Sequence, residues 1–286
     1  MTDIEDFIKT KNSSGKNDHN NIDTTKYDLN KCKNIFSNLL TWLSKYEGID
    51  EKDTTNLNKL FESQLNKQIR LSKIQDLKKS VLLNIFNNLL FKTDFDISLH
   101  PYFDILKLLL RKRPMRNISG ITSVTIILHP FPDGQSFSCK HDCFYCPNEP
   151  AHAGNNWQAQ PRSYLFWEPA VQRANRWNFN ALQQMFDRLD GYFANGHTID
   201  KLEIIVEGGT FTEFPVAYLE RYHRDLFYAA NIYFDVRRIY QNYDNFDVGD
   251  LELDKLKNIR PPLSVQEEIN INKTSKVHII GICIET

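Results

Sequence analysis

A chain of 286 residues with 41% hydrophobic and 12% aromatic side chains is long enough for one large domain, or for a large domain with a smaller one attached. Its apolar runs fall well short of the roughly 20 residues of a membrane span, and its acidic start at Asp3, Glu5 and Asp6 is unlike a secretory signal. The net charge of −1 predicts no polyanionic partner for the chain as a whole. We therefore expect a soluble, cytoplasmic protein without a membrane partner.

The first part of the chain predicts a disordered leader and then a helical module. Residues 1–26 are rich in Asn, Asp, Lys, Ser and Thr, and they hold too few large apolar side chains to offset the entropy of ordering. From Leu29 to Tyr46 apolar residues recur every three or four positions, which predicts an amphipathic helix with Cys32 in its core. Further helices are expected over residues 55–68, 72–90 and 101–112, with a loop at 94–100.

Positive charge is concentrated late in this module. Residues 67–116 contain eleven Lys or Arg against four Asp, a local charge of +7. Such a region either contacts nucleic-acid phosphates or is a solvated helix face. We expect the helical module to cover residues 27–112.

The pattern changes to alternating strands and helices after Arg113. Strands are predicted over residues 122–128, 201–206 and 277–285, and helices over 169–195 and 215–230. This order predicts an α/β fold with about three parallel strands, in a sheet or a partial (βα) barrel whose active site lies at the C-terminal ends of the strands. The domain is expected to span residues 113–286, with an insertion at about 232–276.

Three of the five cysteines lie within eight residues. Cys139, Cys143 and Cys146 have the spacing C-x3-C-x2-C on a loop that directly follows the first strand, which favours metal or cluster ligation over disulfides. Three thiolates can hold a 4Fe-4S cluster and leave one iron open, whereas a structural cluster takes a fourth cysteine. The alternative is a zinc site completed by His141 or His152, although no second zinc-binding half is present.

An open iron in such a motif is typical of radical S-adenosylmethionine (SAM) enzymes, in which SAM binds it. Tyr145 occupies the position where that superfamily packs the SAM adenine, with ordinary packing under the loop as the alternative. The pair Gly208 and Gly209, followed by Thr210, ends the second strand and resembles the turn that contacts the SAM amino group. Cys283 alternates with isoleucines in a predicted strand, so we expect it in the core rather than at the cluster.

The order of segments resembles the catalytic subunit of Elongator, a family that modifies the wobble uridine of tRNA. Five stretches carry the resemblance over about residues 107–286: Arg113 to Gly120, the Tyr-Cys-Pro at Tyr145, Ser163-Tyr164 with Glu168-Pro169, Glu207 to Phe211, and Gly281 to Thr286. Two local departures are the separation of Cys139 from Cys143, which is longer in many members, and Pro147-Asn-Glu-Pro150, where many members have Pro-Gly-Gly-Pro.

The resemblance implies a radical SAM enzyme that uses a 4Fe-4S cluster, SAM and acetyl-CoA to form a carboxymethyl-type uridine in tRNA, a tRNA uridine(34) acetyltransferase. For tRNA binding we expect contributions from Arg111, Lys112, Arg113 and Arg116. The family continues beyond the position of Thr286 with further strands and an acetyltransferase-like domain. We therefore expect an N-terminal part or a split-gene half, completed by a second polypeptide or other Elongator subunits. The alternative is a catalytically incomplete iron-sulfur protein that binds tRNA.

Overall fold

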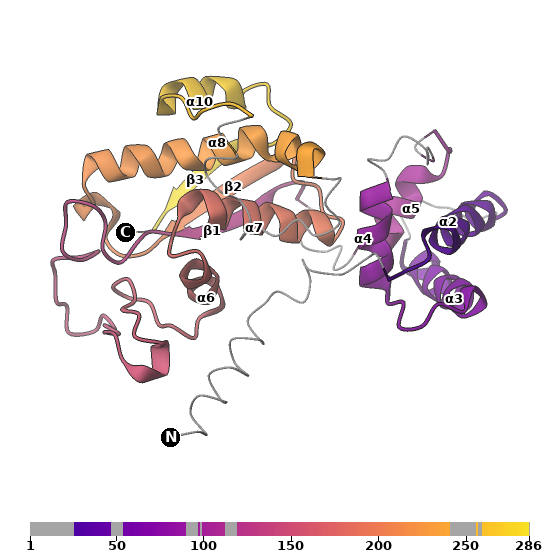
Figure 1. The fold of residues 1–286 in the computed structure, drawn as a ribbon, viewed down its shortest axis with the longest axis horizontal. Helices are drawn as coiled ribbons and strands as arrows, with labels where there is room; N and C mark the ends of the chain where they lie inside the picture. The colour runs from indigo at the N-terminus through magenta and orange to yellow at the C-terminus, as the bar shows by residue number, and fades with distance from the viewer. Residues whose placement is uncertain are drawn as a thin grey trace. The chain divides into compact units, whose positions relative to one another are not determined.

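The computed structural model describes most of the chain, namely residues 26–46, 54–89, 97, 99–111, 119–240, 256 and 259–285. These residues divide into two compact units (Figure 1). A helical unit holds the described residues up to Arg111 together with 191–197 and Tyr240, and a sheet unit holds 119–190, 198–239, 256 and 259–285. The expected disordered leader lies outside the described residues except for Lys26, as does most of the expected loop at 94–100.

The helical unit is built from four amphipathic helices: α2 (Leu29–Ser44), α3 (Thr54–Ser72), α4 (Lys79–Leu89) and α5 (Phe103–Leu110). Helix α2 begins at Asp28, whose carboxylate accepts hydrogen bonds from the backbone N–H groups of Asn30 and Lys31. Its periodic apolar side chains are buried, and Cys32 is fully buried among them, as predicted. The expected helix at 72–90 begins only at Lys79, because positive φ angles at Lys73 and Asp76 interrupt the helical path.

A short segment distant in sequence completes this unit. The backbone carbonyl of Phe193 accepts a hydrogen bond from the Asn87 side chain at 2.9 Å, and that of Gly196 accepts one from Arg111 Nε at 3.0 Å. Gly196 has a φ of +75°, and a Cβ there would lie 3.3 Å from the side chain of Leu83. A glycine at this position therefore lets the segment approach α4 closely.

The sheet unit contains three parallel strands in the order β1 (Thr122–Ile127), β2 (Lys201–Glu207) and β3 (His278–Ile284). This confirms the predicted α/β class with three parallel strands. The side chains of Leu202, Ile204 and Val206 alternate with polar or less buried ones, so one face of β2 is buried. The pairing of β2 with β3 contains an irregularity at Leu202 and Glu203, where the partner changes from Ile279 to Gly281.

Helices α7 (Ala181–Ala194) and α8 (Val216–Tyr240) cross the same side of the sheet in Figure 1. The Gln184 side chain bonds both the N–H and the C=O of Ile127, at 3.0 and 2.9 Å. The Tyr222 hydroxyl donates to the carbonyl of Ile126 at 3.1 Å. These side chains satisfy backbone groups of the edge strand β1 and so attach both helices to it.

The remaining elements lie before and after these helices. Helix α6 (Pro169–Arg176) precedes α7, the 3-10 turns η2 (Ala153–Asn155) and η3 (Phe211–Glu213) lie in loops, and α10 (Val265–Asn272) precedes β3. None of the helices in the described part of the chain has the length and apolarity needed to cross a membrane.

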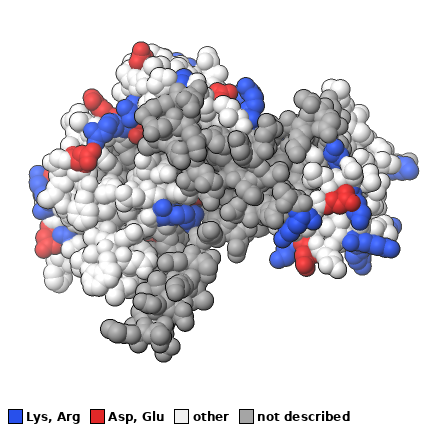
Figure 2. Space-filling view, viewed as in Figure 1, with Lys and Arg blue, Asp and Glu red and all other residues white. Residues whose placement is uncertain are grey.

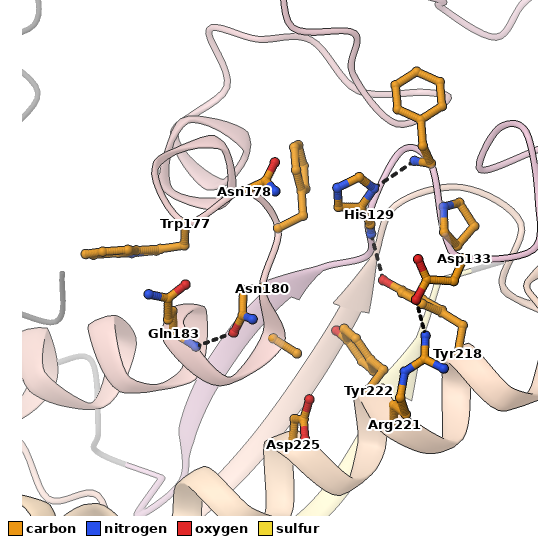
Figure 3. A pocket seen from close by; sticks show the side chains of 14 residues that line it. His129, Asp133, Trp177, Asn178, Asn180, Gln183, Tyr218, Arg221, Tyr222 and Asp225 are labelled. Carbon is orange, nitrogen blue, oxygen red and sulfur yellow. Dashed lines mark hydrogen bonds and ion pairs between the residues drawn. The ribbon is translucent and has the colours of Figure 1, made fainter. Parts of the chain in front are cut away.

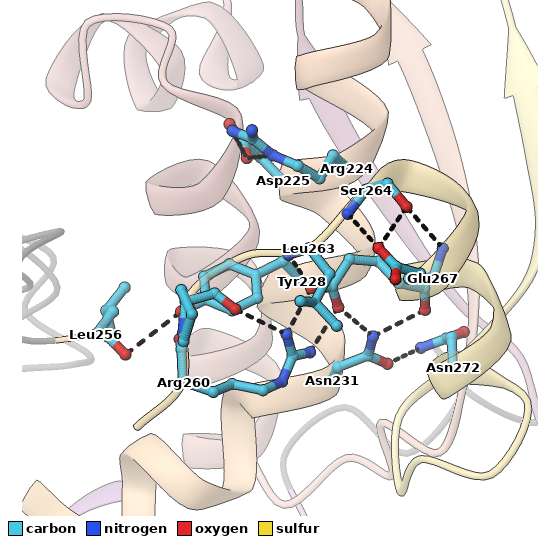
Figure 4. Close-up of polar contacts among 12 residues, drawn as sticks. Arg224, Asp225, Tyr228, Asn231, Leu256, Arg260, Leu263, Ser264, Glu267 and Asn272 are labelled. Atoms are coloured by element: carbon cyan, nitrogen blue, oxygen red, sulfur yellow. Dashed lines mark hydrogen bonds and ion pairs between the residues drawn. The ribbon is translucent and has the colours of Figure 1, made fainter. Parts of the chain in front are cut away.

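Helix α10 is fastened to α8 by a buried carboxylate (Figure 4). Glu268 is fully buried and accepts two hydrogen bonds of 2.5 Å from Arg260 and one of 2.8 Å from the Asn231 side chain. Burial raises the pKa of Glu268, but the hydrogen bonds from Arg260, Leu263 and Asn231 outweigh burial and hold that pKa below its ordinary value. The segment around α10 is therefore ordered by charge pairing as well as by packing.

Two predicted boundaries are wrong. The helix expected over 169–195 is two helices, because Asn178 and Phe179 adopt positive φ angles between α6 and α7. The insertion expected at 232–276 begins too early, since α8 continues to Tyr240. Residues 241–255 of that insertion lie outside the described part of the chain.

The expectation that Cys283 lies in the core is also wrong, because its side chain is exposed. Cys283 is paired with Ile205, whose neighbours Ile204 and Val206 are the residues directed toward the helices. The alternation of β2 and β3 therefore places Cys283 on the opposite face of the sheet. An apolar strand pattern did not reveal which face is covered.

Candidate functional site

The three motif cysteines lie on the long loop between β1 and α6, at the C-terminal edge of the sheet. Cys139 is 7% exposed, Cys146 is partly exposed and Cys143 is exposed, and all three are free thiols. A turn in which the N–H of Cys146 donates to the carbonyl of Cys143 at 3.0 Å brings the second and third cysteines into one local bend. Cys139 is thus anchored in the protein, whereas the other two are presented to solvent.

The turn after β2, Gly208 to Thr210, packs against this loop and is called its seat below. Gly208 and Gly209 have φ angles of +128° and +107°, and a Cβ at Gly208 would lie 2.8 Å from the backbone nitrogen of Leu128. A Cβ at Gly209 would lie 3.2 Å from the carbonyl oxygen of Ser138, next to Cys139. Thr210 Oγ1 lies 3.4 Å from Cys139 Sγ. The structure therefore brings the predicted Gly-Gly-Thr turn against the first predicted cluster ligand, and chain packing alone already requires both glycines.

Arg162 attaches the loop from the other side. Its backbone N–H donates to Ser138 Oγ at 2.9 Å, and its Nη2 donates to the carbonyl of His141 at 2.9 Å and to the Asp142 carboxylate at 2.5 Å. The guanidinium is 7% exposed, and its Nε and Nη1 are buried without a hydrogen-bond partner. Buried donors without a protein partner are uncommon in folded proteins, so these two nitrogens are free to bond a water or another acceptor.

The histidines proposed for a zinc site have other contacts. His152 caps η2, with Nδ1 accepting from the N–H of Gly154 at 3.0 Å and Nε2 lying 3.1 Å from Glu149. His141 Nε2 lies 3.9 Å from Glu213. Within the described residues, no three His, Cys, Asp or Glu side chains converge as a metal-binding group. Both ring nitrogens of His152 are thus engaged by other groups, and the ring of His141 approaches Glu213.

An acidic group lies near the C-terminal ends of β2 and β3. The Tyr164 hydroxyl donates to the Glu285 carboxylate, and the N–H of Glu285 donates to the carbonyl of Val206 at 3.0 Å. Burial raises the pKa of Glu207, and the negative charge of Glu285 raises it further. These residues lie within the family motifs named above, but the sequence predicted no role for them. Their membership of those motifs is the signal by which they could have been found.

Tyr145 is 87% exposed, so the alternative that it packs under the loop is wrong. Its neighbour Phe144 is fully exposed as well. Exposed aromatic rings beside the thiols leave a stacking surface for a ligand. The contact with a SAM adenine stays a prediction.

A cavity of about 360 Å³ lies beside the start of the same loop (Figure 3). Figure 3 shows Asp133 and Arg221 directed toward one another, an ion pair of 2.5 Å, and the Tyr218 hydroxyl accepting from the N–H of His129 at 2.9 Å. Burial lowers the pKa of His129 and raises that of Asp225, which also lines the cavity. None of the three motif cysteines is among the lining residues, although the first residues of the same loop, from His129 to Asp133, are.

The described part of the basic region presents exposed cations on the helical unit, and Figure 2 shows Lys and Arg side chains on this unit with a few acidic ones between them. The exposed members are Lys67, Arg70, Lys73 and Lys78. Arg111 is half-buried, and its bond to Gly196 gives it a structural role that was not expected. Burial lowers the pKa of Arg111. Lys112, Arg113 and Arg116 lie outside the described residues.

Comparison with known proteins finds relatives of one kind. The chain is 30% identical over 175 residues to a tRNA uridine(34) acetyltransferase of Dehalococcoides mccartyi (strain CBDB1), a match covering 61% of this chain and 29% of the relative. It is 31% identical over 183 residues to a protein of the same name from Methanocaldococcus infernus, covering 64% of this chain and 28% of the relative. Elongator complex protein 3 of Schizosaccharomyces pombe is 29% identical over 185 residues, covering 64% of this chain and 30% of that protein.

These relatives confirm the resemblance to Elongator catalytic subunits that the motifs indicated. The match spans less than a third of the length of each of the three relatives. No family model matches the chain.

Proposed function

We propose that this chain is the cluster-binding part of a radical SAM enzyme of the Elongator type, acting on the wobble uridine of tRNA with SAM and acetyl-CoA. The observation that carries the proposal is the placement of three free thiols on the loop after β1, the first of which, Cys139, lies against the Gly-Gly-Thr turn after β2. The similarity to proteins named tRNA uridine(34) acetyltransferase supplies the reaction and the substrate.

Residues of the loop and of the turn after β2 have different roles in binding the cofactors. Cys139, Cys143 and Cys146 would hold a 4Fe-4S cluster with a site left for SAM, and the chemistry supplied there would be one-electron reductive cleavage of SAM. The turn from Gly208 to Thr210 lies against Cys139 and contacts SAM, and the exposed ring of Tyr145 stacks on its adenine. Acetyl-CoA is the co-substrate, and a second polypeptide or other Elongator subunits are the expected partners.

Anaerobic reconstitution tests the cluster. We expect about four irons and four sulfides per chain, and loss of both in the Cys143→Ala variant. Cys283→Ala is the matched control, because Cys283 is also an exposed free thiol but lies on β3. Stoichiometric zinc after aerobic purification, with iron never incorporated, would contradict the proposal.

Formation of 5'-deoxyadenosine from SAM by the reduced, reconstituted protein tests the chemistry. Product that depends on the cluster is expected. A protein that holds an intact cluster and binds tRNA but leaves SAM uncleaved would instead favour the alternative, a catalytically incomplete iron-sulfur protein that binds tRNA.

Binding of tRNA is tested with the exposed cations of the helical unit. We expect affinity to fall steeply with salt, and to fall further when Lys67 and Arg70 are both changed to Glu, because phosphate contacts release counterions. Lys45→Glu is the control, since Lys45 is exposed on the same unit but precedes the basic region. Arg111 is left unchanged because it holds Gly196. Affinity that is flat with salt would identify these charges as a solvated face.

A further inference from the structure

Arg162 contacts the thiol loop at two places that flank Cys139. Its backbone N–H bonds the side chain of Ser138, the residue before Cys139, and its guanidinium bonds His141 and Asp142, which precede Cys143. One residue therefore ties down both ends of the stretch that sets the spacing of the first two thiols. The segment that carries Arg162 is ordered in turn, since the N–H of Ser163 donates to the carbonyl of Pro147 at 3.0 Å.

The partners on the loop are unequal. The Asp142 side chain is 90% exposed, so water screens its attraction to the guanidinium. The carbonyl of His141 is a backbone acceptor and holds the loop itself rather than a side chain that can rotate away. The bond to His141, with the backbone bond to Ser138, is therefore the part that positions the loop.

Two nitrogens of the guanidinium donate no hydrogen bond to the protein. Its Nε and Nη1 are buried and have no partner in the protein, although burying an unpaired charged donor is costly. Its centre lies 6.0 Å from the centroid of the Phe137 ring, which offers a π face and no hydrogen-bond acceptor of ordinary strength. A permanent positive charge beside the Cys139–Cys143 stretch, shielded from water, is suited to an anionic group held by those thiols.

Resting on the proposed function, we propose that Arg162 is a positioning residue for the cluster: it fixes the loop between Ser138 and Asp142, and its positive charge stabilises the reduced cluster. Hydrogen bonds and charge near the sulfurs are among the factors that set cluster potentials. Removing the charge should make the potential more negative, because the reduced cluster carries the extra electron.

The first test uses the protein without cluster. Cys139 is 7% exposed and reacts with iodoacetamide after the loop opens, so Arg162→Gln should raise its alkylation rate by about tenfold. Arg221→Gln is the matched control: Arg221 also bonds an aspartate of the loop after β1, Asp133, but it is 45% exposed. Hydrogen exchange in β2 checks that the sheet stays folded. An unchanged Cys139 rate with β2 intact would overturn the positioning role.

The second test uses the loaded protein. Arg162→Gln should shift the midpoint potential in a mediated redox titration to more negative values, whereas Arg162→Lys, which keeps the charge without the planar fork, should keep the potential near that of the parent and still raise the alkylation rate. Equal potentials in Gln and Lys variants would overturn the electrostatic role. If Arg162→Gln does not fold, Ser138→Ala is used instead, because it removes only the acceptor of the backbone hydrogen bond from Arg162. The positioning role is overturned if Cys139 is alkylated at the parent's rate in both Ser138→Ala and Arg162→Lys.

The two tests separate this inference from the proposed function. Alkylation is measured without iron, so it decides the positioning role even if the parent protein binds zinc. In that case the electrostatic role fails together with the proposed function. If the Arg162 variants have a normal iron content, an unchanged alkylation rate and an unchanged potential, the proposed role of Arg162 is wrong while the proposed function stands.

Discussion

The helical unit and the sheet unit both have apolar interiors, but they differ in the number of polar and charged side chains buried there. In the helical unit the described core consists of apolar side chains from α2 to α5, with Asn87 and His197 as its buried polar residues. In the sheet unit, buried polar and charged side chains tie the elements together, among them Arg162, Gln184, Asp187, Asp190, Glu268 and Asn272. An apolar core tolerates other apolar side chains of similar volume, whereas a buried polar group requires its particular partner. The two units should therefore respond differently to conservative substitution.

The largest effect is expected at Asp190, which accepts hydrogen bonds from Arg237 and Tyr233 of α8 and is 3% exposed. Asp190→Ala leaves the guanidinium of Arg237 buried without its counter-charge and should lower the free energy of unfolding by about 3–5 kcal/mol. Urea denaturation measures this loss.

The control for Asp190 is Asp235→Ala, because Asp235 pairs with Arg238 on the surface, where the two side chains are 49% and 69% exposed. We expect that control to change stability by less than about 0.5 kcal/mol. Similar losses in the two variants would show that buried pairing does not distinguish the sheet unit.

In the helical unit the corresponding experiment is Leu39→Ala. Leu39 is fully buried on α2, and its truncation should cost about 2–5 kcal/mol through lost burial and the cavity left behind. Leu39→Met should cost less than about 1.5 kcal/mol, because the volume is kept. Thermal or urea unfolding measures both, and equal costs would contradict the tolerance expected of this core.

A pH-dependent effect is expected at the buried carboxylate Glu268. Because the folded-state pKa of Glu268 is held below its ordinary value of 4.5, its carboxylate contributes stability above pH 4.5 that is lost as the pH falls through the lowered folded-state value. The stability difference between the parent and Glu268→Gln should therefore shrink as the pH is lowered from 6 toward 3. Urea midpoints across this range measure it, and a constant difference would rule out the linkage.

The smallest effects are expected at two helix starts, and they should be alike. Asp28 caps α2 in the helical unit, and Ser264 caps α10 in the sheet unit by accepting from the N–H of Glu267. Replacing either by Ala should cost about 1 kcal/mol, since each removes one cap. Peptide-resolved hydrogen exchange localises the loss, and clearly unequal costs would mean that the units differ in more than their interiors.

Sequence periodicity was sufficient where packing is apolar. The helix from Leu29 and the burial of Cys32 follow from spacing alone, since one face of α2 meets one core. The break between α6 and α7 could not be found in this way. Asn178 tolerates a left-handed conformation, but Phe179 gives no signal for its φ of +55°. Tertiary contacts of Phe179, which is buried with Val171 and Ala174, favour that turn.

The candidate site divides in the same manner. The spacing of Cys139, Cys143 and Cys146 and their place after a strand were available from the sequence, as was the Gly-Gly turn. The contact between that turn and Ser138, and the bonds of Arg162, were not, because they join parts of the chain that are distant or irregular. Cys283 shows the same limit, since only the pairing of β3 reveals its exposed face.

The seat of the thiol loop also has a consequence for timing during synthesis. Thr210, which contacts Cys139, follows it by 71 positions in the chain. At about 5–20 residues per second, a ribosome adds the seat on the order of 4–14 s after the first thiol. During that interval the turn after β2 has not been made, so the loop cannot pack against it. The contact between Cys139 and Thr210 can therefore form only after the second strand has been made and has paired with the first.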